Sequence, residues 1–181
     1  MPHNCTVKRV TPQEVDHLIG ALSDVLVDCV EGGASVSFML PIDRKTALGF
    51  WEKVAFDVKS GTRALFVAQD AHGTVVGTVQ LILNLPENQP HRADVAKMLV
   101  HRRARRLGVA ELLLHHLESS ARDEMRSVLV LDTVTGGDAE RLYERLGWQR
   151  VGVVPGYALM PSGELCSTTF FYKTLPSDSS S

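Results

Sequence analysis

Met98-Leu99-Val100-His101-Arg102-Arg103-Ala104-Arg105-Arg106-Leu107-Gly108-Val109-Ala110 is the most informative stretch of this sequence. An apolar strand ends, a basic loop follows, and a helix begins at a small-residue turn. A helix N-terminus presents unpaired backbone N–H groups and the positive end of the helix dipole, which suits an anion. Gly108 lets the backbone approach a phosphate without a Cβ, and Arg105 and Arg106 add positive charge. The stretch predicts a phosphate-binding turn; a solvated basic loop before a core helix is the alternative.

Two familiar phosphate-binding loops do not fit. A P-loop requires Gly-Lys-Ser/Thr, and the dinucleotide fingerprint requires several glycines, whereas Gly108 is the only glycine in this stretch. The loop by itself therefore indicates an anion site without naming the anion.

The segments around the loop alternate between helical and strand periodicity. Apolar residues at helical spacing predict a helix over Val109–Met125, and the apolar run Ser127–Leu131 predicts a buried strand. Another helix is expected over Ala139–Leu146. The other expected strands are Cys5–Val10, Arg63–Gln69, Thr74–Leu83, Arg92–Val100, Trp148–Val154 and Thr168–Lys173, and the other expected helices are Val15–Cys29 and Asp43–Lys59.

The resulting order, β-α-α-β-β-β-α-β-α-β-β, predicts an α/β fold with a mixed sheet. An ordinary three-layer α/β fold without an anion site fits the same order. The 181 residues, 44% of them hydrophobic, suit one domain with a sizeable core, which we expect over residues 1–175. The Ser-rich tail, residues 176–181, is expected to be frayed.

The composition argues against several classes of partner. With a net charge of −2 and a pI of about 6.4, we expect neither nucleic acid nor a membrane surface as a partner. No apolar run approaches the length of a membrane span. Three scattered cysteines without CxxC spacing favour a reduced, cytoplasmic protein. No metal is expected, because His115 and His116 are adjacent on a helix and point in different directions.

Two sequence blocks together resemble a known family. Arg105-x-x-Gly108-x-Ala110 after the strand is similar to the Q/R-x-x-G-x-G/A motif of GCN5-related N-acetyltransferases (GNAT). Ala139-Glu140-Arg141-Leu142-Tyr143-Glu144-Arg145-Leu146-Gly147-Trp148 is similar to the family's A-x-x-L-Y-x-x-L-G-F segment. The resemblance covers roughly Leu65 to Lys173. It implies an acetyl-CoA-dependent N-acetyltransferase with a mixed, mostly antiparallel sheet, flanking helices and splayed central parallel strands.

Three further stretches resemble the tabtoxin resistance protein subgroup. They are Gly32-Gly33-Ala34-Ser35-Val36-Ser37-Phe38-Met39, Leu131-Asp132-Thr133 and Pro155-Gly156-Tyr157. Members of this subgroup acetylate a small amino-acid-like toxin. The resemblance implies a small primary amine as the acceptor, with detoxification or antibiotic resistance as the role.

The resemblance also implies how the co-substrate, acetyl-CoA, is held. The strand before the loop carries a bulge, and the backbone of Leu99 and Val100 holds the pantetheine and the acetyl carbonyl. Backbone N–H groups from Arg106 to Ala110 hold the pyrophosphate. Gly136 stands where many relatives have Asn, so Asp138 is expected to cap the last helix instead. The expected cofactor-binding residues are Met98, Leu99, Val100, Arg105, Arg106, Leu107, Gly108, Val109, Ala110 and Asp138.

The catalytic candidates are a tyrosine and two carboxylates. Tyr143 matches the family tyrosine, which donates a proton to the leaving thiolate; a core tyrosine is the alternative. The amine must lose a proton before it attacks, and a carboxylate is a natural base. Asp132, leaving the buried strand, and Asp94, entering the third strand, are both candidates. Phe38 and Trp51 are candidates for lining the substrate pocket, with core packing as the alternative.

Direct transfer in a ternary complex is expected, because neither motif block contains a cysteine that could carry the acetyl group. Acetylation of a protein N-terminus or lysine is an alternative. A family member that binds acyl-CoA as a sensor without chemistry is another, although the retained Tyr143 argues against it. The protein is expected to be a monomer or a homodimer.

Overall fold

A seven-stranded mixed sheet organises the protein. The computed structural model describes residues 5–176. The strand order is β1-β2-β3-β4-β5-β7-β6, and every neighbouring pair is antiparallel except β4 and β5. The strands are β1 Thr6–Arg9, β2 Arg63–Gln69, β3 Val75–Ile82, β4 Arg92–Val100, β5 Val128–Val134, β6 Gln149–Leu159 and β7 Leu165–Thr174.

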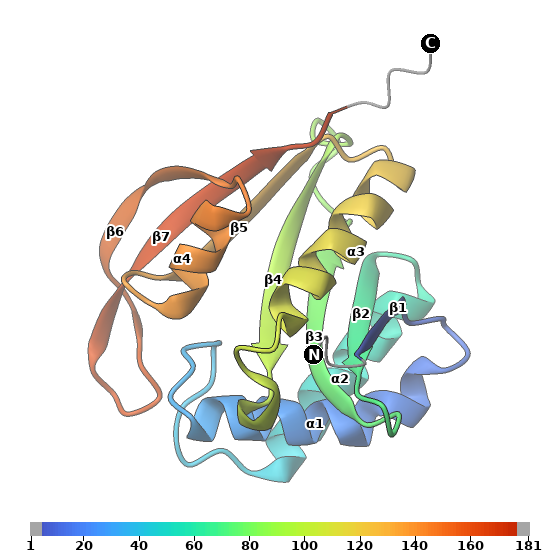
Figure 1. The fold of residues 1–181 in the computed structure, drawn as a ribbon, viewed down its shortest axis with the longest axis vertical. Coiled ribbons are helices and arrows are strands. Elements are labelled where there is room, and N and C mark those ends of the chain that lie inside the picture. The colour runs from blue at the N-terminus through green and yellow to red at the C-terminus, as the bar shows by residue number, and fades with distance from the viewer. Residues whose placement is uncertain (1–4, 177–181) are drawn as a thin grey trace.

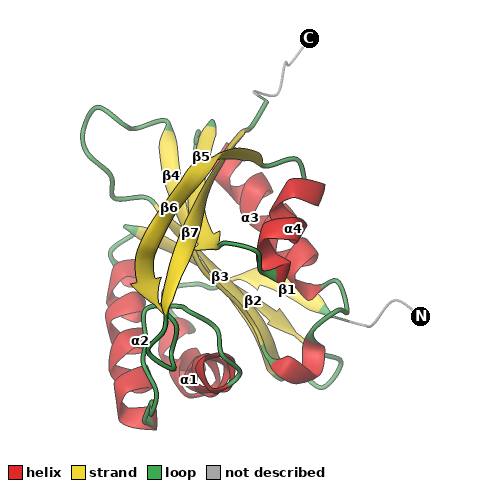
Figure 2. Cartoon of the chain, turned by 90° about the vertical axis from the view of Figure 1, so that its left-hand side faces the viewer, coloured by secondary structure: helices red, strands yellow, loops and turns green. Residues whose placement is uncertain are grey.

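Helices cover both faces of this sheet (Figure 1). They are α1 Val15–Glu31, α2 Arg44–Lys59, α3 Val109–Asp123 and α4 Asp138–Arg145, with a short 3-10 turn at Arg102–Ala104. Figure 2 shows α1 and α2 on one side of the sheet and α3 and α4 on the other. Two hydrophobic cores follow, one under each pair of helices. The predicted mixed, mostly antiparallel sheet with flanking helices is confirmed.

Three strands are longer than the sequence pattern predicts; one of them is β7, which was expected over Thr168–Lys173 and runs over Leu165–Thr174. β5 was expected to end at Leu131 but continues to Val134, because β7 pairs with it over its whole length. β6 was expected to end at Val154 but reaches Leu159, after an irregularity between Val154 and Ala158. Cross-strand pairing, which the sequence does not display, sets both of these ends. The tail that was expected to be frayed comprises Pro176 and residues 177–181. Residues 177–181 lie outside the described residues.

The central parallel strands splay apart, as predicted. β4 and β5 are paired only at Arg92–Val128, Ala93–Leu129 and Asp94–Val130. Beyond these pairs β4 stays on β3 and β5 stays on β7, so the two strands diverge (Figure 1). A bulge redirects β4 at this point: Lys97 and Met98 lie opposite the single residue Val79, and Lys97 has a φ of 53°.

Gly77 on β3 lets the first turn of α3 pack directly on the sheet. A Cβ at this position would lie 3.0 Å from Val109 Cγ1, 3.2 Å from Leu113 Cδ1 and 3.2 Å from the Leu99 carbonyl oxygen. The close approach fixes where the loop before α3 lies relative to the end of β4.

Gly77→Ala is expected to lower the free energy of unfolding by about 1–3 kcal/mol, the usual cost of overpacking a core. Gly49→Ala serves as the matched control, because its Cβ would meet no atom within 4 Å in the middle of α2. That variant should be stabilised by about 0.5–1 kcal/mol through helix propensity. Chemical denaturation measures both values, and equal changes in the two variants would contradict the packing argument.

Candidate active site

The gap between the diverging strands forms a cavity of about 480 Å³. One wall is the free edge of β4 from Val95 to Met98, and the other is β5 from Leu131 to Val134. Tyr143 of α4 and residues 32–37, after α1, also line it. Neither free edge has a partner strand here, so an extended ligand can lie between them as an added strand does.

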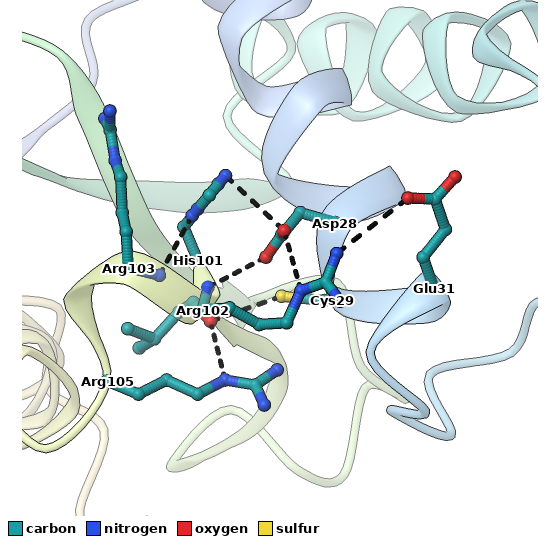
Figure 3. A network of polar contacts seen from close by, with 8 residues as sticks. Asp28, Cys29, Glu31, His101, Arg102, Arg103 and Arg105 are labelled. Atoms are coloured by element: carbon teal, nitrogen blue, oxygen red, sulfur yellow. Dashed lines mark hydrogen bonds and ion pairs between the residues drawn. The ribbon is translucent and has the colours of Figure 1, made fainter.

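The predicted phosphate loop is fastened to the end of α1 (Figure 3). Asp28 accepts hydrogen bonds from the Arg102 backbone N–H at 2.8 Å and from Arg102 Nε at 2.9 Å. His101 Nε2 lies 3.5 Å from the same carboxylate, and Cys29 Sγ donates to the Val100 carbonyl at 3.4 Å. Partial burial works to raise the pKa of Asp28, but the hydrogen bonds from Arg102 outweigh it and lower that pKa. The carboxylate therefore stays ionised and holds the loop in place.

The loop leaves a row of backbone donors free. Among the described residues, the N–H groups from Arg106 to Glu111 donate to no other backbone group, and Leu112 is the first residue of α3 whose N–H has an acceptor. Arg106 and Gly108 have φ values of 60° and 77°, which turn the chain sharply before the helix. Successive free N–H groups at a helix start form an anion-binding concavity. The geometry fits the predicted phosphate site.

Gly108→Val is expected to weaken acetyl-CoA binding by at least about tenfold, because a residue with a β-branched side chain resists the left-handed conformation at a cost of about 1–2 kcal/mol. The new side chain would also stand beside the free N–H groups. Isothermal titration calorimetry measures the dissociation constant.

Gly61→Val is the matched control for this prediction. Gly61 has a φ of 73° and, like Gly108, has no atom within 4 Å of a Cβ built on it. It follows α2 and does not line the cavity. The control should lose stability and keep its acetyl-CoA affinity; unchanged affinity in Gly108→Val would remove the loop from the binding site.

Tyr143 reaches the cavity from the core. Its side chain is 4% exposed and packs against Trp148 and Phe171, with ring centroids 5.7 Å and 6.0 Å away. Ala139, one helical turn earlier, lines the cavity beside it. Burial, assisted by the negative charge of Asp132, raises the pKa of Tyr143 well above its ordinary value. The hydroxyl therefore keeps its proton and is a donor.

Asp132 lies inside β5 and not at its end. It pairs with Phe170 of β7 on one side, while its other side faces the gap that β4 has left. Burial raises the pKa of Asp132; the positive charge of Lys97 opposes this shift, and Asp94 adds to it. A carboxylate with a raised pKa is a better proton acceptor than an ordinary one.

The structure does not bring the second predicted carboxylate to the cavity. Asp94 is the last β4 residue paired with β5, and its carboxylate forms an ion pair with Arg92. It lines neither this cavity nor its neighbour, described below. Asp94 acts on the site through its charge, and of the two candidate bases only Asp132 lines the cavity.

Three other predictions need correction. Trp51 is 1% exposed, belongs to the core under α1 and α2, and lines neither cavity. Asp138 does not cap α4, because Gly137 is the N-cap and Asp138 pairs with Arg141; it does line the cavity. Of the β4 residues assigned to the cofactor, Met98 lines the cavity, whereas Leu99 and Val100 do not.

Of the predicted loop residues, only Arg105 lines the cavity itself. Its Nε donates to the Val100 carbonyl at 3.3 Å. Leu107 is partly exposed, and Val109 is buried against the sheet. Arg106, Gly108 and Ala110 belong to the row of free donors outside the cavity.

A smaller cavity of about 320 Å³ adjoins the first. Phe38 lines it, as predicted for a substrate-pocket residue, together with Tyr157 of β6 and Thr168 of β7. The two cavities share one charged residue, Asp132; their other common residues are Ser35, Ser37, Thr133 and Val134.

Sequence reasoning missed Lys97, the residue at the bulge. Its side chain lines the large cavity, donates to Ser37 Oγ at 3.0 Å and lies 5.8 Å from the centre of the Phe50 ring. Burial lowers its pKa, while Asp132 opposes this shift and Arg63 adds to it. A signal was present, because a lysine between Val95 and Leu99 interrupts an otherwise apolar strand face.

The sequence profile of the acetyltransferase (GNAT) domain family matches residues 61–150, which contain the bulged strand, the loop and Tyr143. The chain belongs to the GNAT acetyltransferase family. It is an acetyl-CoA-dependent N-acetyltransferase.

Several solved structures have the same fold as this chain. A putative acetyltransferase from Salmonella typhimurium with its cofactor acetyl-CoA has a TM-score of 0.75 and 18% identity over 98% of this chain and 97% of that one. A phosphinothricin acetyltransferase from Sinorhizobium meliloti in complex with acetyl-CoA has a TM-score of 0.75 and 14% identity over 98% of this chain and 92% of that one. A ribosomal-protein-alanine N-acetyltransferase from Brucella melitensis has a TM-score of 0.74 and 22% identity over 94% of this chain and 99% of that one. These likenesses show a shared fold.

The GNAT site fits acetyl-CoA in both of its parts. The free N–H groups from Arg106 to Glu111 suit the pyrophosphate, and the gap between β4 and β5 suits the extended pantetheine. Within residues 5–176, no three His, Cys, Asp or Glu side chains gather closely enough to hold a metal ion. None of the described helices combines the length and apolarity that crossing a membrane requires.

Proposed function

We propose that this GNAT enzyme acetylates the primary amine of a small, amino-acid-like metabolite or toxin by direct attack in a ternary complex. The observation that carries the proposal is the place of Asp132, the one charged residue common to the two adjoining cavities. The larger cavity takes the acetyl-CoA arm, and the acceptor enters through the smaller one so that its amine lies at the junction, where Asp132 and Ser37, the hydrogen-bond partner of Lys97, line both cavities. A base at their junction can reach an amine that faces the thioester.

The walls of the smaller cavity favour a small acceptor over a polypeptide. The segment after α1 is hydrogen-bonded to the β6–β7 hairpin: Ser35 Oγ donates to the Leu159 carbonyl at 2.9 Å, and the Leu40 N–H donates to the Pro161 carbonyl at 3.0 Å. These contacts bridge the groove that a protein substrate would need to remain open. A volume of about 320 Å³ is at the lower end of small-molecule sites.

The residues have distinct roles in the proposed reaction. Acetyl-CoA supplies an acetyl thioester, whose carbonyl is attacked by the amine. Asp132 accepts a proton from the ammonium, directly or through water, since an unperturbed alkyl ammonium has a pKa of about 10 and no lone pair. A backbone N–H at the free edge of β4 stabilises the negative oxygen that forms during attack. As the C–S bond breaks, Tyr143 donates its hydroxyl proton to the departing sulfur, and the second proton that the nitrogen loses as the amide forms returns through water to the tyrosinate.

The remaining parts of the proposal extend the family resemblance. The tabtoxin-resistance-like stretches, and the phosphinothricin acetyltransferase from Sinorhizobium meliloti that shares the fold, support a role in detoxification or antibiotic resistance. We place residues 1–175 in one catalytic domain, which acts in the cytoplasm as a monomer or homodimer.

Release of the CoA thiol over a panel of amines tests the proposal. The panel includes free amino acids, amino-acid amides, polyamines, and peptides with a free N-terminus or an internal lysine. Fastest release with a small amino-acid-like amine is the expected result. Preference for peptides would favour protein acetylation, and tight acetyl-CoA binding without release on any amine would favour the sensor.

A further inference from the structure

We infer that Lys97 determines acceptor specificity by pairing with a carboxylate on the amine substrate. The inference rests on the proposed function, because it concerns the second substrate of that reaction. It narrows the acceptor to an amine that carries a carboxylate a few bonds away.

The backbone places Lys97 at the site at some cost. Its φ of 53° and the φ of 78° at Ser37, its hydrogen-bond partner, lie in the left-handed region that side-chain-bearing residues avoid. Arg106 of the phosphate loop has the same feature. Three of the four such non-glycine residues in the described chain therefore border the site; the fourth is Met125. Strained residues persist where the surrounding structure holds them, and they cluster at ligand sites.

The charge of Lys97 has no counter-charge in contact with it. Neighbouring charged groups are paired among themselves, Arg63 with Asp57 and Arg92 with Asp94. Within residues 5–176, Lys97 joins no ion pair, and its contacts are the Ser37 hydroxyl and the face of the Phe50 ring. An ammonium has three donors, so hydrogen-bonding capacity remains. Removing a cation partly from water costs free energy unless an anion pairs with it.

Lys97 and Asp132 present opposite charges to the same cavity without touching each other. An amino acid carries an ammonium and a carboxylate on neighbouring atoms, so it can satisfy both: the ammonium at Asp132 and the carboxylate at Lys97. A protein N-terminus or an internal lysine has an amide in place of that carboxylate. The pair of charges therefore selects free amino-acid-like amines over peptides, by the same electrostatic complementarity that sets specificity in other interfaces.

The turnover test compares α-amino acids with the matching α-amino-acid amides, which differ only in the anionic group. Lys97→Met should lower kcat/KM for the acids by about tenfold to a hundredfold, mainly through KM, as expected for loss of one charged hydrogen bond. The amides should change much less, because they carry no carboxylate for Lys97 to pair with. Lys97→Arg should keep the preference for acids.

Lys53→Met is the matched control, because Lys53 is exposed on α2 and has no ion-pair partner among the described residues. It should behave as the wild type. Equal losses for acids and amides in Lys97→Met would overturn the inference and leave Lys97 as a support for the bulge.

A binding test separates this inference from the proposed function, because it needs no turnover. Calorimetry with the CoA-saturated protein compares N-acetyl amino acids, the products, with N-acetyl amino-acid amides. If the wild type binds the acids more tightly than the amides and Lys97→Met loses this difference, the carboxylate site is supported. If in addition no amine is acetylated, the proposed reaction is wrong but the carboxylate site stands. Equal binding of acids and amides to the wild type would overturn the inference whatever the turnover.

Discussion

Asp132→Asn is expected to lower kcat/KM for the amine by about a hundredfold to ten-thousandfold, the range typical of a lost general base. Asn has nearly the same shape but cannot accept the proton. The affinity for acetyl-CoA should change little, because the carboxylate faces the junction of the two cavities. Steady-state kinetics with the best amine and calorimetry with acetyl-CoA measure the two quantities separately.

The pH dependence of the wild type provides a second measurement on Asp132. The base acts when it is ionised, so the rate falls as pH falls through its pKa. Burial raises that pKa; Lys97 and Asp94 on β4 act on it in opposite directions, and the Tyr143 hydroxyl on α4 is uncharged. We expect the acidic limb of the kcat/KM profile to lie above the ordinary aspartate value of about 3.9. The limb should be absent from the residual activity of Asp132→Asn.

The substitution Asp132→Asn should not lower the folding stability, although it lowers the activity. The pKa of Asp132 is higher in the folded than in the unfolded chain, so folding stability declines as pH rises from the unfolded pKa through the folded one, and the loss persists at neutral pH. The Asn variant cannot ionise and should be at least as stable as the wild type at pH 7 in thermal unfolding. A slow but stable variant would show that the lost activity is not misfolding.

Asp94→Asn provides the comparison between the two carboxylates. Because Asp94 pairs with Arg92 and lines neither cavity, its loss should cost much less activity than the loss of Asp132. The reverse order of effects would assign the base to Asp94.

Tyr143→Phe is the second variant with a large expected effect, about a hundredfold on kcat, which is within the range for a lost general acid. The ring keeps its contacts with Trp148 and Phe171, so the volume of the core is conserved and stability should change by less than about 1.5 kcal/mol. The dissociation constant for acetyl-CoA should remain near that of the wild type. Single-turnover kinetics with saturating amine and acetyl-CoA measure the chemical step.

Tyr172→Phe is its matched control. Tyr172 lies on β7, is 40% exposed and lines neither cavity, so the same loss of a hydroxyl should leave turnover unchanged. If Tyr143→Phe turned over at the wild-type rate, another group or water would have to protonate the sulfur.

Many helices and strands could be predicted because their signals are local. The amphipathic stripe of α3 and the apolar run of β5 depend on residues within each segment, and both lie where expected. The ends of β5 and β6 could not be predicted, because β7 decides how far each strand continues. Asp132 was expected at the end of a strand, whereas it lies within β5 and lines the cavity.

The errors at the site share a physical cause. Trp51 is an aromatic residue on an amphipathic helix, and nothing in the sequence distinguishes the face that covers the core from a face that lines a pocket. The cofactor-facing residues of β4 were shifted because a bulge inserts one extra residue and changes the side to which the following positions point. Lys97 was missed because its role depends on what lies across the cavity.

The sequence by itself determined the glycine turn that precedes α3, the order of the elements and the helix that carries Tyr143. These features arise from residues that are close along the chain, where a glycine, a helix start and an apolar stripe act on one another directly. Only the tertiary structure decided that Lys97, Ser37 and Asp132 face one cavity, since Lys97 and Ser37 are 60 residues apart and meet through the bulge and the segment after α1. Charge complementarity between distant residues depends on the geometry of the folded chain, so the carboxylate site that we propose for the acceptor could be inferred only from the tertiary structure.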